Sequence, residues 1–106
     1  RVWMNPPYAG KLIGKFVAKL IDHYVAKDVK EAVVLVTNAT ETKWLQAMLE
    51  HASAMALPAG RVKFWHPRHP RKESAPLQGQ AVLYFGKHLD EFSEAFGPLG
   101  AICHVV

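Results

Sequence analysis

A helical stripe followed by a buried strand is the pattern that most constrains the fold of this chain. Apolar residues recur in adjacent pairs every four positions over residues 12–25, as in an amphipathic helix that packs one face on a sheet. The stripe consists of Leu12, Ile13, Phe16, Val17, Leu20, Ile21, Tyr24 and Val25. The run Ala32-Val33-Val34-Leu35-Val36 is short, continuous and rich in β-branched residues, which favours a strand buried on both faces.

The segments before and after this helix and strand predict a further strand and a further helix. Val2 to Met4 is an apolar run that predicts a short strand. Asn38 or Thr40 could cap a second helix, and Thr42 also has the character of a helix-start residue. The apolar residues of that helix are Trp44, Leu45, Met48 and Leu49. Strand, helix, strand, helix within 106 residues predicts a single α/β domain.

The second half of the chain changes character. Arg61-Val62-Lys63-Phe64-Trp65 alternates charged and apolar residues, as in a half-exposed strand. Ala81-Val82-Leu83-Tyr84-Phe85 lies beyond a Pro-rich loop, and we expect these two strands to pair antiparallel. Asp90 to Phe96 predicts a brief helix that Gly97-Pro98 ends, and Ala101 to Val106 predicts a closing strand.

Composition and charge narrow the class of protein. Half of the residues are apolar and 21% are charged, which is typical of a globular domain. The net charge of +4 and the isoelectric point near 9.4 favour an anionic partner. The single Cys103 excludes an internal disulfide, and its apolar surroundings predict a buried, reduced thiol. No apolar run reaches the roughly 18 residues of a membrane span and no signal peptide opens the chain, so we expect a cytoplasmic protein.

Asn5-Pro6-Pro7-Tyr8 follows the first predicted strand and has the chemistry to hold a planar amine. The Asn5 side-chain oxygen and the Pro6 carbonyl are two acceptors for the two N–H bonds of an exocyclic amino group. The two prolines fix the backbone before a ligand arrives, and preorganised dipoles of this kind lower a barrier. Tyr8 offers a face on which an unstacked base can lie, a contact worth about 1–3 kcal/mol. The motif therefore predicts methyl transfer to nitrogen.

The position of the motif adds to its chemistry. A tetrapeptide alone is a weak signal, because any strand can end in Pro-Pro and a turn. In open α/β sheets, however, ligands bind beyond the carboxyl ends of the strands, and Asn5-Pro6-Pro7-Tyr8 occupies such an end. A base in a duplex would first have to be flipped out to reach it.

Several spaced segments resemble the phage Dam-like family of phage and bacterial adenine-N6 DNA methyltransferases. They are Val2-Trp3-Met4-Asn5-Pro6-Pro7-Tyr8, Val33-Val34-Leu35-Val36 with Thr40-x-Thr42-x-Trp44, Arg61-Val62-Lys63-Phe64, and Ala81-Val82-Leu83-Tyr84-Phe85-Gly86. The resemblance spans almost the whole chain. It implies a Rossmann-like S-adenosylmethionine-dependent methyltransferase fold with a C-terminal antiparallel hairpin. It also implies S-adenosylmethionine as methyl donor and adenine in double-stranded DNA as acceptor.

The same resemblance assigns roles to the catalytic loop. Asn5 and Pro6 would bind the amino group, Pro7 would complete the loop, Tyr8 would stack on the base, and Asn5 and Tyr8 would border the methionine end of the cofactor. Ala9 departs from the Ser that is common at this position in the family. The donor-binding strands precede the motif in related enzymes and are absent here. We therefore expect residues 1–106 to be one domain, the catalytic part of a longer enzyme.

A basic segment follows residue 60 and is a candidate for DNA binding. Its five positive charges are Arg61, Lys63, Arg68, Arg71 and Lys72, with no acid between them. Beside the catalytic edge, such a segment would neutralise phosphates without reading bases, whereas the alternative is an ordinary solvated loop. His66 and His69 lie in the same segment but lack further ligands, so we expect no metal site there.

Three functions stay open at the level of sequence. The first is a site-specific adenine-N6 DNA methyltransferase that acts on a flipped adenine. The second is a methyltransferase acting on a glutamine amide or an RNA base amine, because these planar nitrogens fit the same holder. The third is a DNA-binding fragment without turnover. The basic segment and the family resemblance favour the first, in a bacterial host or phage-infected cell.

Overall fold

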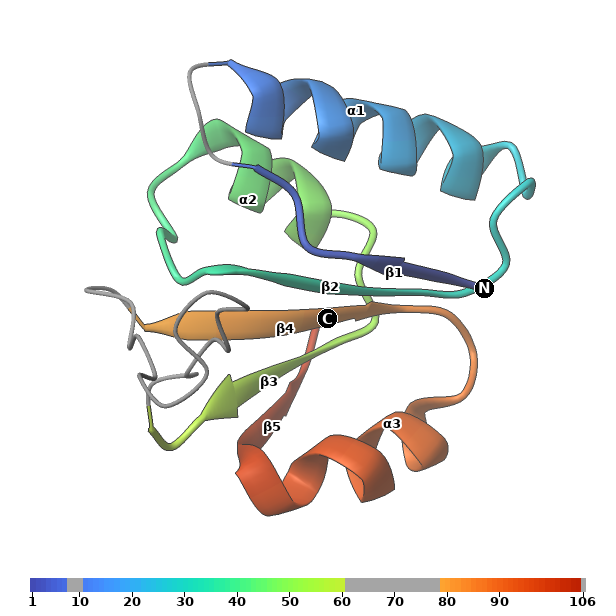
Figure 1. The fold of residues 1–106 in the computed structure, drawn as a ribbon. Coiled ribbons are helices and arrows are strands. Elements are labelled where there is room, and N and C mark those ends of the chain that lie inside the picture. The colour runs from blue at the N-terminus through green and yellow to red at the C-terminus, as the bar shows by residue number, and fades with distance from the viewer. Residues whose placement is uncertain (8–10, 61–78, 106) are drawn as a thin grey trace, which may run out of the picture.

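The computed structural model describes residues 1–7, 11–60 and 79–105, which form a five-stranded sheet with three α-helices (Figure 1). In chain order the elements are β1 (Val2–Met4), α1 (Leu12–Val25), β2 (Ala32–Thr37), α2 (Lys43–Leu49), β3 (Ala54–Pro58), β4 (Gln80–Phe85), α3 (Leu89–Phe96), a 3₁₀ turn η1 (Gly97–Leu99) and β5 (Gly100–His104). The predicted α/β class is confirmed. No helix within these ranges is long and apolar enough to cross a lipid bilayer.

The sheet is mixed and has the strand order β1-β2-β4-β3-β5. β1 and β2 are parallel, because α1 crosses over between them, and every other neighbouring pair is antiparallel. Val34 pairs with Met4 on one side and with Leu83 on the other, so β2 is an internal strand. In the described ranges β1 and β5 form the two edges of the sheet.

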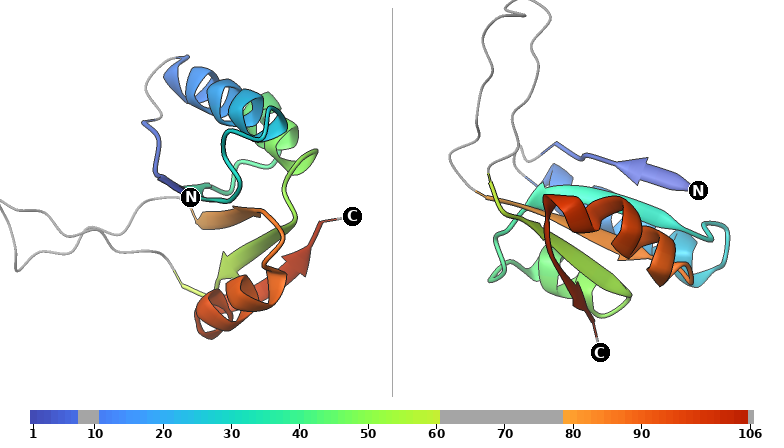
Figure 2. Two further views of the ribbon diagram at one scale, coloured as in Figure 1. Left: turned by 90° about the vertical axis from the view of Figure 1, so that its right-hand side faces the viewer. Right: turned by 90° about the horizontal axis from the view of Figure 1, so that it is seen from below.

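Helices cover both faces of the sheet (Figures 1 and 2). α1 and α2 lie on one face, where Val17 and Met48 join a core with Val34 and Phe85. α3 lies on the other face, where Phe92 packs with a second cluster. Because successive side chains of a strand point to opposite faces, a strand between two helical layers must be apolar throughout. The prediction of a buried strand at residues 32–36 is confirmed, since β2 contributes to both cores.

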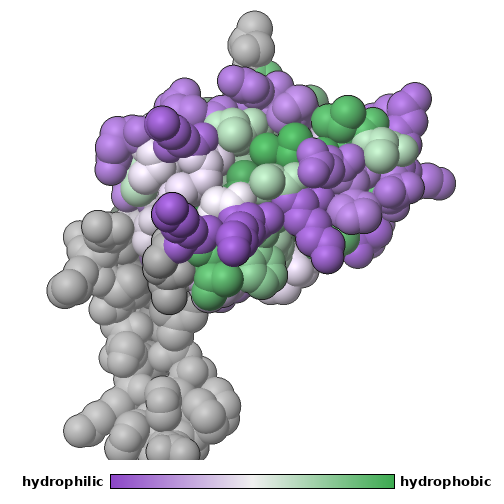
Figure 3. All heavy atoms as spheres, turned by 90° about the horizontal axis from the view of Figure 1, so that it is seen from above, coloured by the Kyte–Doolittle hydropathy of each residue, from purple (hydrophilic) through white to green (hydrophobic). Residues whose placement is uncertain are grey.

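The apolar stripe of α1 is narrower than predicted. Ile13, Val17 and Leu20 are buried, but Leu12 and Phe16 are 44% and 43% exposed. A helix lying on a sheet buries only the side chains nearest the sheet, so one member of several apolar pairs reaches solvent. Figure 3, which looks onto this side of the molecule, shows hydrophobic surface broken up by hydrophilic side chains.

The cap of α2 is Thr42, not Asn38 or Thr40. The Leu45 amide donates to the Thr42 hydroxyl oxygen at 3.4 Å, and that hydroxyl donates to the Ala39 carbonyl at 2.7 Å. The backbone of Thr42 is extended and α2 begins at the next residue. Thr42 therefore satisfies one of the free amides in the first turn of α2.

The strand β3 was not indicated by the sequence. Its segment Ala-Met-Ala-Leu-Pro has no β-branched residue, so burial and not intrinsic propensity places it in the sheet. Ala54 and Ala56 are fully buried, and their small side chains share a cluster with the Phe92 ring of α3. β3 pairs antiparallel with β4 through Ala56 and Val82. The predicted partner strand at residues 61–65 lies outside the described residues.

The last two elements agree with the prediction, but the burial of Cys103 does not. The short helix and the closing strand are present as α3 and β5. The prediction of a buried Cys103 is wrong, because this thiol is exposed. β5 is an edge strand in which Ile102 packs towards α3, and the neighbouring position therefore faces away from that core at the rim of the sheet.

Candidate functional site: the Asn-Pro-Pro loop

The loop begins where the prolines end β1. Met4 pairs with Val34, whereas the two residues after Asn5 are prolines and have no amide N–H to continue the ladder. β2 runs on to Thr37. Asn5 therefore leaves the sheet at the carboxyl end of an edge strand, beside the last residues of an internal strand (Figure 1).

The three described residues of the loop differ in burial. Pro6 is buried, whereas Asn5 and Pro7 are exposed. Pro6 thus anchors the loop by its ring, and its fixed φ limits the directions in which the flanking peptide groups can point. Within the described residues, the Asn5 carboxamide takes part in no hydrogen bond, so its oxygen is open to a ligand. Tyr8, the predicted stacking residue, lies outside the described residues.

Further segments meet at the same edge of the sheet. Thr37 pairs with Gln80 at the start of β4, and the Asn38 amide donates to the Gly79 carbonyl at 3.1 Å. β3 is antiparallel to β4 and therefore also ends at this edge, close to where β4 begins (Figure 1). Residues 61–78 connect the end of the β3 segment to Gly79, so both attachment points of this segment lie on the edge that carries the Asn-Pro-Pro loop.

The predicted DNA-binding residues cannot be placed individually. Arg61, Lys63, Arg68, Arg71 and Lys72 all lie outside the described residues, as do His66 and His69. The described residues that flank their segment, Gly60 and Gly79, follow β3 and precede β4 at the carboxyl edge. Their phosphate contacts stay a prediction.

A polar cluster at the opposite edge was missed by sequence reasoning. The Tyr84 hydroxyl donates to a Glu31 carboxylate oxygen at 2.6 Å and accepts from the His88 amide at 2.8 Å. Arg1 forms an ion pair with the other Glu31 oxygen at 2.7 Å. These residues are far apart in the chain and belong to no motif, so no local signal could have found them.

The cluster shifts the protonation of its members. The hydrogen bond from Tyr84 holds the pKa of the Glu31 carboxyl below its usual 4.5 in spite of partial desolvation, and the charge of Arg1 lowers this pKa further. Burial, and then the bond to Glu31, raises the pKa of Tyr84 to about 12. Both groups therefore keep their neutral-pH states, Glu31 ionised and Tyr84 protonated, over a wide pH range.

Comparison with known protein families agrees with the sequence resemblance. Residues 1–102 match the sequence profile of the DNA N-6-adenine-methyltransferase (Dam) family. No curated protein and no solved structure was found to match the chain. Because the match includes every described element from β1 to α3 and most of β5, the chain belongs to the DNA N-6-adenine-methyltransferase (Dam) family.

Proposed function

We propose that this chain is the catalytic part of an S-adenosylmethionine-dependent methyltransferase that modifies the N6 amine of adenine in double-stranded DNA. One observation carries the proposal: an exposed Asn5, without a hydrogen-bond partner among the described residues, follows an edge strand at the carboxyl edge of the sheet, directly before a buried Pro6, in a chain of the Dam family. Ligands of open α/β sheets bind at such an edge.

The loop would act on the amino group by accepting hydrogen bonds from its two N–H groups. The lone pair of an adenine amine is delocalised into the ring and attacks poorly until the nitrogen becomes tetrahedral. The Asn5 side-chain oxygen and the Pro6 carbonyl would each accept a hydrogen bond from one N–H group. These two bonds favour the tetrahedral geometry as positive charge develops on nitrogen. Pro7 would hold the loop rigid, and Tyr8 would stack on the flipped base.

S-adenosylmethionine, when bound, would supply an electrophilic methyl group on a sulfonium. The adenine nitrogen would gain the methyl carbon, the donor sulfur would keep the electron pair of the broken bond, and one amine proton would be released. Asn5 and Tyr8 would border the methionine end of the donor. Asn5, Pro6 and Pro7 line neither the cavity beside Glu31 nor the groove between α1 and α2. We therefore assign the adenosine end to another part of the enzyme.

The free edge of β1 supports a place for that donor-binding part. Within the described ranges β1 pairs only with β2, and Trp3 is 60% exposed. Parallel strands are normally covered on both faces and an unpaired edge is normally protected, so this edge is suited to further strands of a Rossmann-like sheet. The parallel β1–β2 pair and the antiparallel β3–β4 pair are consistent with that fold.

Residues 61–78 are proposed to hold the DNA. Five basic residues lie in this segment, and both of its ends are attached at the carboxyl edge of the sheet. Phosphate contacts there would keep a duplex in register while the loop holds the flipped adenine. Such an enzyme would act where DNA is accessible, in a bacterial or phage-infected cytoplasm.

The acceptor is tested by methyl transfer from labelled S-adenosylmethionine to three substrates. The proposal predicts label on the N6 amine of adenine in duplex DNA, and little on RNA or on a glutamine-containing peptide. Transfer mainly to RNA or to the peptide would favour the second function considered from the sequence. Salt-sensitive DNA binding without any donor binding in calorimetry would favour a fragment without turnover.

A further inference from the structure

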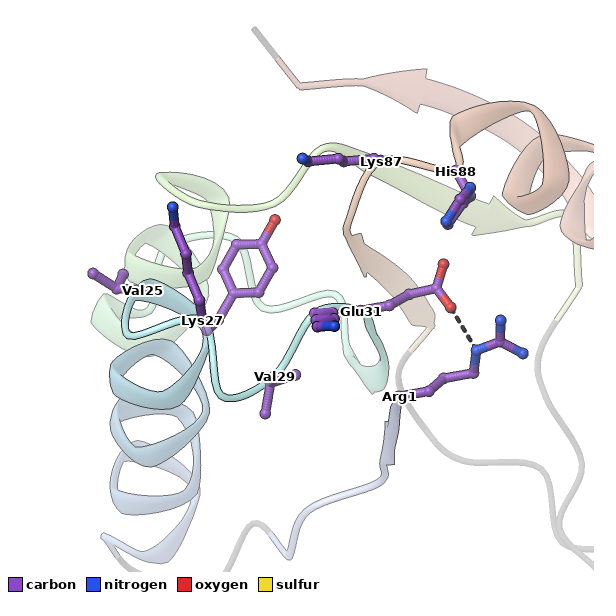
Figure 4. Close-up of a pocket in the computed structure, with 9 residues that line it drawn as sticks. Arg1, Val25, Lys27, Val29, Glu31, Lys87 and His88 are labelled. Carbon is purple, nitrogen blue, oxygen red and sulfur yellow. Dashed lines mark ion pairs between the residues drawn. The ribbon is translucent and has the colours of Figure 1, made fainter.

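A cationic cavity lies at the edge of the sheet opposite to the Asn-Pro-Pro loop. Its volume is about 780 Å³, within the range of about 300–1,000 Å³ that small-molecule sites occupy. It opens where β1 and β2 begin and β4 ends, between the loop after α1 and the loop after β4 (Figure 4). Its lining residues are Arg1, Tyr24, Val25, Lys27, Val29, Lys30, Glu31, Lys87 and His88.

The lining is rich in positive charge. Arg1, Lys27, Lys30 and Lys87 contribute four cations, against the single acid Glu31 among the lining residues. Figure 4 shows Lys27 on the loop after α1, Lys87 on the loop after β4 and Arg1 at the start of β1, around the cavity. Because like charges repel, such an arrangement is costly without an anion, and binding an anion would relieve that cost.

The single acid of the cavity is already engaged. Glu31 accepts the Tyr84 hydroxyl at 2.6 Å and is ion-paired with Arg1 at 2.7 Å. None of the three lysines forms an ion pair with an acid in the described part of the chain. Glu31 therefore positions Arg1 and leaves the charges of Lys27, Lys30 and Lys87 available to a ligand.

An apolar wall accompanies these charges. Val25 is 59% exposed although it is a large apolar side chain, and it lines the cavity with Tyr24 and Val29. The Tyr24 ring is fixed by an edge-to-face contact with Phe85 at 5.4 Å between centroids. A fixed aromatic surface beside lysines suits an anion that also has a flat, weakly polar body.

Lys27 occupies a backbone position that would favour glycine. Its φ is +67°, and its amide donates to the Tyr24 carbonyl at the end of α1. A left-handed residue at this point of a helix is usually glycine, because other side chains are strained there. Lys27 therefore lines the cavity from a strained backbone position.

We propose that this cavity is a second binding site that holds a nucleoside phosphate, with the phosphate among Lys27, Lys30, Lys87 and Arg1 and the base against Tyr24 and Val25. The phosphate belongs either to a free nucleotide or to a nucleic-acid strand. The site is distinct from the position of the target adenine, because the six residues of β2 separate the two edges by about 20 Å. It does not depend on methyl transfer.

Binding is measured by calorimetry with adenosine 5′-monophosphate, adenosine, inorganic phosphate and a short thymidine oligonucleotide. We expect saturable binding of the monophosphate that weakens as salt increases, and weaker binding of adenosine and of phosphate alone. Tighter binding of the monophosphate than of the oligonucleotide identifies a free nucleotide, and the reverse identifies a strand. The site is rejected if the monophosphate does not bind saturably, or if adenosine binds with the same affinity as the monophosphate.

A matched pair of double variants tests the assigned residues. Lys27→Gly with Lys87→Ala removes two charges from the cavity, and the glycine also relieves the strained backbone. Lys15→Ala with Lys19→Ala removes the same net charge from the exposed surface of α1, outside the cavity. We expect affinity for the monophosphate to fall about fivefold or more in the first variant and to stay unchanged in the second.

Three outcomes of this comparison overturn the proposal. Equal losses in both variants would show that overall charge is responsible, and no loss in the first would show that the wrong residues were assigned. Loss of monophosphate binding in Asn5→Ala would place the nucleotide at the carboxyl edge instead. Thermal unfolding of each variant verifies that it is folded. Methyl transfer by the complete enzyme should be unaffected by the cavity variant, which separates failure of this site from failure of the proposed activity.

Discussion

The Tyr84 hydroxyl and the Glu31 carboxylate are joined by a 2.6 Å hydrogen bond across 53 positions of sequence. The bond connects β4 to the residue before β2, and through Arg1 and the His88 amide it reaches β1 and the start of α3. The Tyr84 ring is also stacked on Phe92, with 4.9 Å between centroids. This pair therefore ties the sheet to α3 at the edge that carries the cationic cavity.

Replacing Tyr84 by phenylalanine should destabilise the fold. Tyr84→Phe keeps the stacking ring but removes the donor to Glu31 and the acceptor of the His88 amide. Hydrogen bonds to charged groups contribute about 1.5–3 kcal/mol, so we expect the free energy of unfolding in urea to fall by about 2 kcal/mol. Tyr24→Phe is the control, and a similar loss there would show that the hydroxyl of Tyr84 has no special role.

Stability should also depend on pH through the same pair. The folded pKa of Glu31 lies below its usual 4.5, so its contribution is present above that value and is lost as pH falls through the folded pKa. The folded pKa of Tyr84 is about 12, against 10.0 ordinarily, so its contribution is present below pH 10 and is lost as pH rises towards 12.

Urea unfolding at a series of pH values measures how the free energy of unfolding falls at acid pH (the acid limb) and at alkaline pH (the alkaline limb). Glu31→Gln should flatten the acid limb, because the glutamine has no proton to gain in that range. Tyr84→Phe should flatten the alkaline limb for the same reason. An unchanged acid limb in Glu31→Gln would assign the acid sensitivity to other carboxylates.

Gly86 and Gly14 should respond in opposite ways to alanine. Gly86 has a φ of +149°, and a Cβ there would lie 2.6 Å from the Tyr84 hydroxyl oxygen, so Gly86→Ala should cost about 1–3 kcal/mol. Gly14 lies inside α1 with nothing within 4 Å of an added Cβ, so Gly14→Ala should stabilise by up to about 1 kcal/mol. Thermal unfolding measures both. A neutral Gly86→Ala would contradict the close packing around Tyr84.

The basic segment should determine how DNA binding depends on salt. Each phosphate contact that is lost should reduce the slope of log affinity against log salt by about 0.9. Neutralising Arg68, Arg71 and Lys72 together should therefore flatten the slope without changing which sequence is methylated. Lys15→Ala with Lys19→Ala, which removes two charges from the exposed surface of α1, serves as the control. An unchanged slope would mean that this segment does not contact phosphates.

The elements that the sequence predicted are those with strong local patterns. α1 and β2 have periodic or continuous apolar residues, and their types and positions agree with the structure. β3 was not predicted because Ala54 and Ala56 have low strand propensity. Their small side chains instead allow close packing under α3. Cys103 was misplaced because an apolar stretch does not reveal that its strand lies at the edge of the sheet.

The candidate site was partly predictable for a similar reason. The Asn-Pro-Pro sequence ends a strand by local chemistry, so its place at a carboxyl edge follows once the sheet order is known. The exposure of Asn5 and the burial of Pro6 follow only from packing. The cationic cavity draws residues from three separate segments, and only the topology brings them together.

The most direct test of the proposed activity is the turnover of Asn5→Ala in the complete methyltransferase. If the Asn5 oxygen accepts a hydrogen bond from the reacting amine, the turnover number should fall by about 10²–10³, as when one preorganised polar group is removed from an active site. The dissociation constant for DNA should change by no more than about twofold. Asn38→Ala, which alters the other exposed asparagine of this edge, should keep most of its turnover. Unchanged turnover in Asn5→Ala, or an equal loss in both variants, would contradict the role assigned to Asn5.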